Sequence, residues 1–219
     1  MLNKKINNIK ELLIAEASLA EKMLEKSMQG LMEKKIYLLH EVIEEDEPVM
    51  NSMDMEMDRL CTQAAALYHP GPKELRFILS TLKANYDLER IGDHAVNIAQ
   101  SAIDIIPYNI KDLDLIISKI YNQTMSMLKD AIASFVNERD ELAYYVLKRD
   151  DIVDQQRDSC MGIFSERIKK TPEMSALYLE LVRIVRSLER VADLSTNIAE
   201  YTLFVKKAEI AKHGREEPL

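Results

Sequence analysis

The pattern of apolar and polar residues is helical along almost the whole chain. Apolar side chains recur at intervals of three and four residues, which is the spacing of one face of an α-helix. Few residues interrupt this pattern, because the chain has only five Gly and six Pro. We therefore predict an all-α fold of six long helices. The first covers residues 3–31, the second continues from there to residue 68, and the third covers 72–106. The fourth covers 113–136, the fifth follows the turn at 137–141 and ends at 168, and the sixth covers 172–206.

Short breaks mark the ends of these helices. We expect the first helix to give way to the second near Gly30. The stretch YHPGPKE, residues 68–74, forces a turn because proline cannot continue a helix. IPYNIKDLD, residues 106–114, breaks the chain near its midpoint, and the polar NERDE, residues 137–141, turns it again. The expected order is three helices, a linker and three more helices.

The last helix has clear start signals. Thr171 is predicted to cap it, Pro172 suits the first helical position, and Glu173 lies near the positive end of the helix dipole. After this helix, the stretch AKHGREEPL, residues 211–219, is predicted to be a polar tail.

The two halves of the chain repeat one phrase. Residues 88–99 read LERIGDHAVNIA and residues 188–199 read LERVADLSTNIA, with seven of twelve positions identical. Pro72 and Pro172 stand at the same distance before the two phrases. A match in register with an upstream proline indicates internal duplication. We accordingly divide the chain into residues 1–108, 109–210 and the tail 211–219.

Each copy of the phrase places two acids one helical turn apart. Glu89 and Asp93 share a helix face, and this face is apolar further upstream. The acids therefore lie where a packed seam becomes polar, and like charges there are unfavourable unless a cation offsets them. The remaining members of the pattern are Asn97 in the first copy, and Glu189, Asp193 and Asn197 in the second.

A positive charge is therefore expected beside each acid pair. Arg90 and Arg190 directly follow the two glutamates, and each can pair with the aspartate three residues later. A metal ion is the other candidate. The sequence leaves both open.

The predicted second and fifth helices carry similar pairs. Glu47 and Asn51 are four residues apart, as are Asp150 and Asp154. If antiparallel neighbours bring these pairs to those of the repeated phrase, four oxygen-bearing side chains meet in each half. Oxygen ligands suit hard cations such as Mg²⁺, Ca²⁺ and Mn²⁺, or oxidised iron. Three further acids on these helices are predicted to lie on solvated faces, namely Asp54, Asp58 and Asp158.

Composition and charge exclude several functions. A net charge of −8 argues against non-specific nucleic-acid binding. No apolar run is long enough to span a membrane, and no signal peptide is recognisable, so we predict a cytoplasmic protein.

Cys61 and Cys160 are predicted to be buried thiols, and His94 a partly packed side chain. No hydrolase, P-loop or dinucleotide-binding motif occurs.

The repeated phrase, with EVIEEDEPVMN, PGPKELRFIL and LKRDDIVDQ, resembles the PhoU family of phosphate-signalling proteins over nearly the whole chain. The resemblance implies two tandem three-helix bundles related by pseudo-twofold symmetry. It also implies a negative regulator of phosphate uptake and of the phosphate-starvation response, without catalytic activity. Such a regulator is expected to form a homodimer, to connect the phosphate ABC transporter ATPase with a sensor histidine kinase, and to reach the membrane only through these partners.

Some members of this family bind multinuclear metal clusters through E(D)xxxD pairs. Carried over, the resemblance implies iron, manganese, zinc or magnesium ions at these pairs. In the first half, Asn51 supplies a neutral oxygen where a carboxylate is expected, which weakens that site. The implied ligands are Glu47, Asn51, Glu89, Asp93, Asp150, Asp154, Glu189 and Asp193, with Arg90, Arg190, Asn97 and Asn197 beside them.

Three other functions match parts of the sequence. A carboxylate-bridged metal enzyme can be built in a helical bundle, but the Glu-x-x-His pattern typical of such sites is not repeated here. A purely structural protein would satisfy its acids with Arg90 and Arg190. A PhoU-like partner of a sodium–phosphate cotransporter is the third.

Overall fold

Helices make up nearly all of the described chain. The computed structural model describes residues 2–110, 113–212 and 215–218, with the backbone alone for 209–212 and 215–218. The α-helices are α1 (Leu2–Glu33), α2 (Ile36–Glu41), α3 (Glu47–Leu67), α4 (Pro72–Ile105), α5 (Asp114–Val136), α6 (Asp140–Leu147), α7 (Asp150–Lys170) and α8 (Ser175–Lys207). The π turn η1 (Val42–Asp46) joins α2 to α3, and the 3-10 turn η2 (Pro172–Met174) precedes α8. The strands β1 (Glu209–Lys212) and β2 (Arg215–Pro218) form an antiparallel pair.

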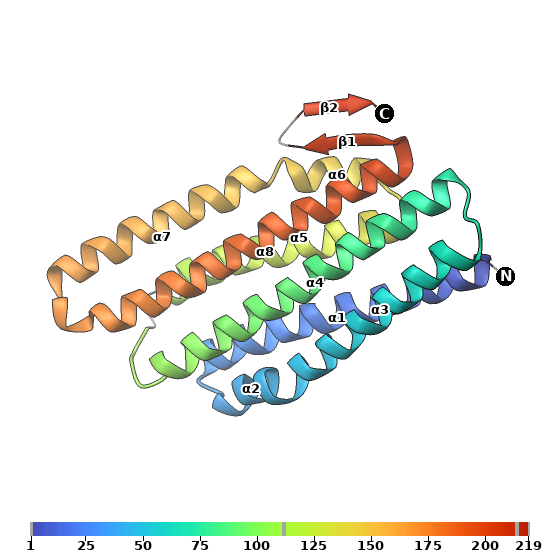
Figure 1. Ribbon diagram of the computed structural model, residues 1–219. Helices are drawn as coiled ribbons and strands as arrows, with labels where there is room; N and C mark the ends of the chain where they lie inside the picture. Colours follow the sequence, from blue (N-terminus) through green and yellow to red (C-terminus); the bar gives the residue numbers. More distant parts are fainter. Residues whose placement is uncertain (1, 111–112, 213–214, 219) are drawn as a thin grey trace.

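The helices form two bundles that lie side by side (Figure 1). The first contains α1, α3 and α4, and the second contains α5, α6 with α7, and α8. The helices α4 and α8 pack along each other, and α1 also contacts α5. The predicted all-α fold of two tandem three-helix bundles is confirmed. Among the residues described, no helix combines the length and the apolar character that a membrane span requires.

Side-chain contacts show that α4 and α8 run antiparallel. Tyr201 of α8 donates a hydrogen bond from its hydroxyl to Asp87 Oδ2 on α4 at 2.9 Å. Further along α4, His94 is close enough to Arg190 for the charge of this arginine to lower its pKa, and Arg190 precedes Tyr201 on α8. The midpoint of this register falls between Gly92 and His94 on α4, and between the equivalent positions Ala192 and Leu194 on α8. The sequence repeat is therefore expressed as a pseudo-twofold axis between the bundles.

Apolar side chains fill both bundles and the seam between them. Phe77 of α4 and Phe135 of α5 stack across this seam, with their ring centroids 5.8 Å apart. Cys61 and Cys160 are free buried thiols, which confirms that prediction. Apolar residues at helical spacing on α4 are buried throughout, at Ala84, Leu88, Ile91, Ala95 and Ile98.

The first turn lies later than predicted. Gly30 is inside α1, which continues to Glu33, and the chain leaves the helix at Lys34 with a left-handed φ of 56°. Gly30 serves packing instead of a turn, because a Cβ there would overlap the side chain of Leu39 on α2. The missing side chain lets α2 fold back closely against α1.

Replacing Gly30 with alanine is expected to lower the free energy of unfolding by about 1–3 kcal/mol, because the added methyl group overpacks the contact with Leu39. Gly162 inside α7 is the matched control, because nothing lies within 4 Å of a Cβ built there. Gly162→Ala is expected to stabilise the protein by about 0.5–1 kcal/mol through helix propensity. Urea unfolding followed by circular dichroism measures both changes. Shifts of the same sign would contradict the packing role of Gly30.

The predicted second helix is interrupted near its start. The short helix α2 passes into the π turn η1 before α3 begins at Glu47. Pro48 lies in the first turn of α3. A proline ring clashes with the carbonyl four residues earlier at normal helical spacing, here that of Glu44. The wider π turn relieves this clash, which is the physical reason for the irregularity.

The predicted fifth helix is divided in two. The helices α6 and α7 are separated at Lys148 and Arg149. Arg149 is buried, and it donates hydrogen bonds to Ser126 Oγ at 2.9 Å and to Asp130 Oδ2 at 2.5 Å on α5. Its guanidinium carbon also lies 4.2 Å from the centroid of the Tyr145 ring. These contacts hold the turn against α5.

Two predictions near the C-terminal end need correction. Thr171 does not cap the last helix, because its hydroxyl donates to the carbonyl of Arg167 at 2.9 Å at the end of α7. The tail predicted over residues 211–219 is in part a hairpin, because β1 pairs with β2. The residues outside the described part of the chain include 111 and 112 of the linker, and 213, 214 and 219 of this tail.

Candidate functional site

The predicted acids of the first bundle lie along α3 and α4. Glu89 is partly buried, and Asp93, one turn further along α4, is exposed. Burial raises the pKa of Glu89, and the charges of Asp93, Asp54 and Glu47 raise it further. The fold therefore brings Glu47 and Asp93 close enough to Glu89 for their charges to affect its pKa. Asn51 is exposed.

Arg90 does not form the ion pair predicted with Asp93. Within the described residues, its guanidinium lies over the Tyr86 ring, 5.8 Å from the centroid. The charge of Arg90 still acts to lower the pKa of Asp93, but the partial loss of water around this carboxyl outweighs it and raises that pKa overall. Arg90 therefore only weakly neutralises the predicted residues of this bundle, Glu47, Asn51, Glu89 and Asp93, which we call the first acid row. The second acid row is Asp150, Asp154, Glu189 and Asp193 in the second bundle.

The two asparagines that follow the acid pairs have different surroundings. Asn97 is exposed on α4. Asn197 on α8 lies close enough to lower the pKa of Asp87, the buried α4 acid that accepts a hydrogen bond from Tyr201. Asn197 therefore belongs to the interface between the bundles and does not line the second acid row.

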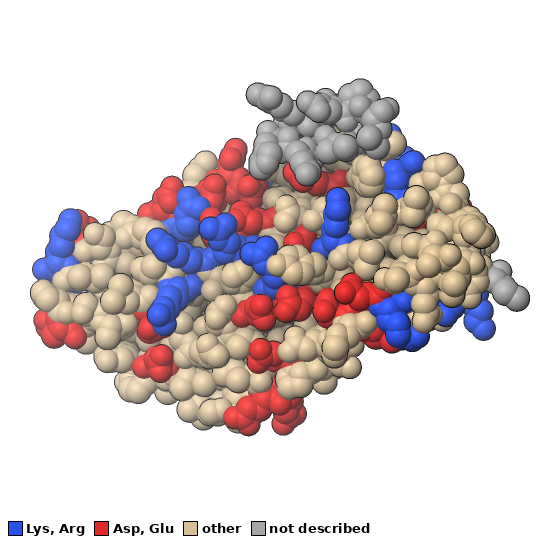
Figure 2. All heavy atoms as spheres, viewed as in Figure 1, with Lys and Arg blue, Asp and Glu red and all other residues tan. Residues whose placement is uncertain are grey.

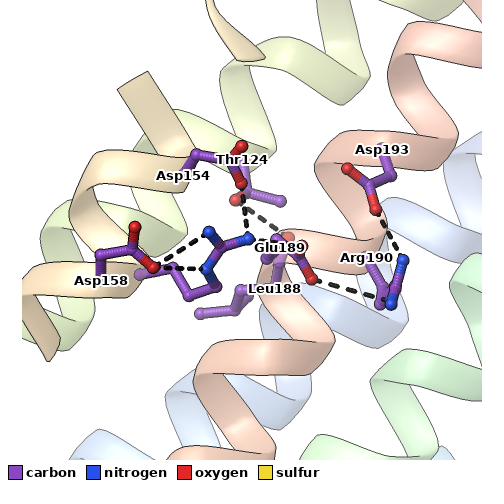
Figure 3. A network of polar contacts seen from close by, with 8 residues as sticks. Thr124, Asp154, Asp158, Leu188, Glu189, Arg190 and Asp193 are labelled. Carbon is purple, nitrogen blue, oxygen red and sulfur yellow. Dashed lines mark hydrogen bonds and ion pairs between the residues drawn. The ribbon is translucent and has the colours of Figure 1, made fainter. Parts of the chain in front are cut away.

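In the second bundle, an arginine outside the predicted set joins the acids. Arg157 of α7 donates to Asp154 Oδ1 at 2.7 Å and to Glu189 Oε1 at 2.8 Å. It also pairs with Asp158 at 2.9 Å. Figure 3 shows Asp154 and Asp158 on the α7 side facing Glu189 on α8. Spacing along the chain does not reveal this contact, because Arg157 and Glu189 come from different helices.

The remaining acids of the second row have raised pKa values. Arg190 Nη1 donates to Asp193 Oδ2 at 3.0 Å, which confirms that predicted pair. Burial and the charge of Glu189 nevertheless raise the pKa of Asp193. Burial raises the pKa of Asp150 to about 6, with further contributions from Asp193 and Asp154. The four predicted acids of this half, Asp150, Asp154, Glu189 and Asp193, therefore lie close enough to interact electrostatically.

Replacing Asp150 with asparagine is expected to stabilise the protein by about 1 kcal/mol at neutral pH. The pKa of Asp150 is about 6 in the fold, above the value of about 4 in an unfolded chain. Its charged form therefore destabilises the fold above pH 6, although the helix dipole at the start of α7 offsets part of this cost.

This gain should disappear as the pH falls to about 4, because the native carboxyl then carries a proton. Thermal unfolding of Asp150→Asn and wild type at neutral and acid pH measures the difference. An equal gain at both pH values would contradict the electrostatic origin.

The first bundle contains a buried acid outside the predicted set. The Glu16 residue of α1 is 0% exposed, and neither of its carboxyl oxygens has a hydrogen-bond partner. Burial raises its pKa to about 9, with contributions from Asp54 and Glu89. The sequence holds a signal for it. Glu16 falls on the apolar stripe of α1, between the buried Leu13 and Ala20.

Asp54 is not the solvated acid that the sequence predicted. It is partly buried and accepts a hydrogen bond from Asn85 Nδ2 at 2.6 Å. Burial, followed by the charge of Asp58, raises its pKa. Asp58 and Asp158 are exposed, as predicted.

The donors in both acid rows suit a hard cation. They are carboxylate and amide oxygens, and burial beside like charges already raises the pKa of Glu89 and Asp193. In the part of the chain that the structure describes, no three His, Cys, Asp or Glu side chains are already arranged to hold an ion. Ion binding therefore requires side-chain adjustment and, in the second bundle, displacement of Arg157.

Acidic and basic groups lie close together on the face seen in Figure 2. Lys and Arg gather in one group, with Asp and Glu on either side, over the region where α4, α7 and α8 lie in Figure 1. The helix α8 carries three exposed arginines, Arg183, Arg186 and Arg190. A surface of both signs suits recognition of a protein partner with a complementary pattern.

Two stretches of the chain, residues 13–102 and 117–202, match the PhoU domain. The chain belongs to the PhoU family. One matched stretch lies in each bundle, on either side of the linker. The boundaries of the PhoU repeats at residues 108 and 210 stay predictions.

Relatives in the PhoU family extend the likeness over nearly the full length. The chain is 30% identical to PhoU homolog 1 of Thermotoga maritima, over 86% of this chain and 81% of that protein. It is 30% identical to the PhoU homolog of Aquifex aeolicus, over 97% and 96%. Both relatives are named phosphate-specific transport system accessory proteins.

Two crystal structures share the PhoU fold. PhoU from Pseudomonas aeruginosa matches with a TM-score of 0.91 and 26% identity, over 95% of this chain and all of that one. The phosphate transport system regulatory protein PhoU from Streptococcus pneumoniae matches with a TM-score of 0.85 and 20% identity, over 97% of this chain. The second match shows the fold alone.

Proposed function

We propose that this chain is a regulatory accessory protein of a phosphate transport system. It represses phosphate uptake and the phosphate-starvation response through protein contacts and not through catalysis. Its partners are the ATPase of the phosphate ABC transporter and a sensor histidine kinase. The observation that carries the proposal is the likeness to named PhoU accessory proteins over 86% and 97% of the chain. We place the protein in the cytoplasm as a homodimer that reaches the membrane through these partners.

Metal ions on the acid rows are the second part of the proposal. Bound iron, manganese, zinc or magnesium would supply the positive charge that offsets the repulsion between the carboxylates. Ions held in this way tie two helices of a bundle together and stiffen the surface that the partners contact. The ligands would be Glu47, Asn51, Glu89 and Asp93 between α3 and α4, and Asp150, Asp154, Glu189 and Asp193 between α7 and α8.

Binding of the full chain to its two partners tests the proposal. We expect the purified chain to bind the transporter ATPase and the cytoplasmic part of the kinase, and to bind each about tenfold more tightly in Mn²⁺ than in EDTA. The double variant Asp93→Asn, Asp193→Asn should lose this Mn²⁺ dependence and keep the metal-free affinity. Asp104→Asn, at an exposed position of α4, is the matched control. Biolayer interferometry measures all three.

The two parts of the proposal can fail separately. Binding to neither partner, with or without Mn²⁺, would rule out the adaptor function. Equal affinity in Mn²⁺ and EDTA would remove the role of the metal and leave the adaptor function in place.

A further inference from the structure

An acidic group extends from the predicted acids of α4 into the first bundle, as far as the buried Glu16. It is formed by Glu16 of α1, Asp54 and Asp58 of α3, and Glu89 of α4, which lie within electrostatic reach of one another. The Glu16 residue is 0% exposed, and both of its carboxyl oxygens lack a hydrogen-bond partner. A buried, unpaired carboxyl is unfavourable in a protein interior. Such a group beside three further acids indicates a place for a positive charge.

A second buried oxygen lies at the same place. Asn85 of α4 is 1% exposed. Its Nδ2 donates to Asp54 Oδ1 at 2.6 Å and to the Asp54 carbonyl at 3.3 Å. Its own Oδ1 has no hydrogen-bond partner. Glu16 and Asn85 therefore present unpartnered oxygens from two different helices beside Asp54.

The second bundle places its own cation at the equivalent position. Asp54 lies seven residues after Glu47, just as Arg157 lies seven residues after Asp150. Arg157 binds Glu189 at 2.8 Å. Asp54 acts instead on the equivalent glutamate of the first bundle and raises its pKa. One bundle therefore has a guanidinium group where the other has another acid.

We propose that Glu16, Asp54 and Glu89 bind a hard divalent cation inside the first bundle, with Asn85 Oδ1 as a further ligand. All donors are oxygens, the set that Mg²⁺, Ca²⁺ and Mn²⁺ prefer. Cys61 lies beside this group, but its soft sulfur suits these hard cations less well than the oxygens do.

This interior site shares Glu89 with the acids between α3 and α4, but it differs from them because it draws a ligand from α1. A bound ion would therefore join all three helices of the first bundle. The side chains must close in around the ion, because no three acids of the described chain are yet arranged about one point. The site does not depend on the proposed transporter and kinase partners.

A Mn²⁺ titration of the full chain, followed through the electron paramagnetic resonance signal of free Mn²⁺, tests this site. The Glu16→Gln variant is expected to bind one ion fewer than the wild type, and it should fold because glutamine has the shape of a protonated carboxyl. Asp54→Asn, at a partly exposed position, is expected to weaken the same ion by at least about tenfold. Glu25→Gln, exposed on α1, is the control and should bind like the wild type.

Loss of one ion in Glu16→Gln, weakening of it in Asp54→Asn and full binding by Glu25→Gln support the interior site. Unchanged Mn²⁺ binding in both site variants overturns it, whether or not the partners bind. Circular dichroism checks that each variant is folded. Asp193→Asn reports separately on the second acid row, so the interior site and the proposed function can fail independently.

Discussion

Replacing Phe135 with alanine is expected to lower the free energy of unfolding by about 3–5 kcal/mol. The side chain is 2% exposed, and its ring stacks on Phe77 with 5.8 Å between the centroids. Phe135 belongs to α5 and Phe77 to α4, so this contact joins the two bundles. Truncation removes the buried ring and leaves a cavity that the surrounding helices can close only in part.

Urea unfolding followed by circular dichroism measures this loss. Tyr37→Ala is the matched control, because that aromatic residue is 61% exposed. We expect it to change stability by no more than about 0.5 kcal/mol. A similarly small effect of Phe135→Ala would show that the seam between the bundles contributes little to stability. If Phe135→Ala unfolds in two transitions where the wild type unfolds in one, the seam couples the two bundles.

Replacing Arg157 with methionine is expected to lower the free energy of unfolding by about 2 kcal/mol at neutral pH. The arginine side chain is 26% exposed and pairs with Glu189, which is 12% exposed. Methionine keeps the packing of the stem but removes the charge. Glu189 and Asp154 then remain close together without the cation that lay between them, and the Arg190 guanidinium, 3.7 Å from Glu189, offsets their repulsion only in part.

Addition of Mn²⁺ should restore part of the stability of Arg157→Met, because an ion can replace the guanidinium group among the carboxylates. Arg183→Met is the control, because that arginine is 72% exposed and pairs only loosely with Glu180 at 3.3 Å. Thermal unfolding with Mn²⁺ and with EDTA measures both variants. Equal losses in the two variants would mean that Arg157 contributes no more than a surface ion pair.

Local patterns predicted most of the fold. The apolar stripe of α4 and the repeat were readable because a helix brings residues three and four apart onto one face. The turns were harder to predict. Its sequence context predicts a turn at Gly30, but the lack of a side chain there is needed for contact with Leu39, which is a tertiary effect. The division between α6 and α7 depends on the buried Arg149, whose partners lie on another helix.

The candidate site was predictable only within each helix. The pair Arg190 and Asp193 was found because the two residues lie on one helix face. The contact between Arg157 and Glu189 was not found, because it depends on the rotation of α7 against α8. Glu16 interrupts an apolar stripe, which by itself predicts only a buried acid. Its importance depends on three acids from two other helices, which spacing within α1 does not reveal.

Because α4 and α8 meet at a pseudo-twofold axis, each half of the molecule has a surface that fits a near copy of itself. A shorter ancestor with a single three-helix unit would pair through this surface as a symmetric dimer. Gene duplication and fusion turn such a dimer into one polypeptide, and each half is then free to diverge. The hydrogen bond between Tyr201 and Asp87 reflects this divergence. The position equivalent to Tyr201 in the first half is Ser101, whose short side chain lacks the phenol that makes this bond.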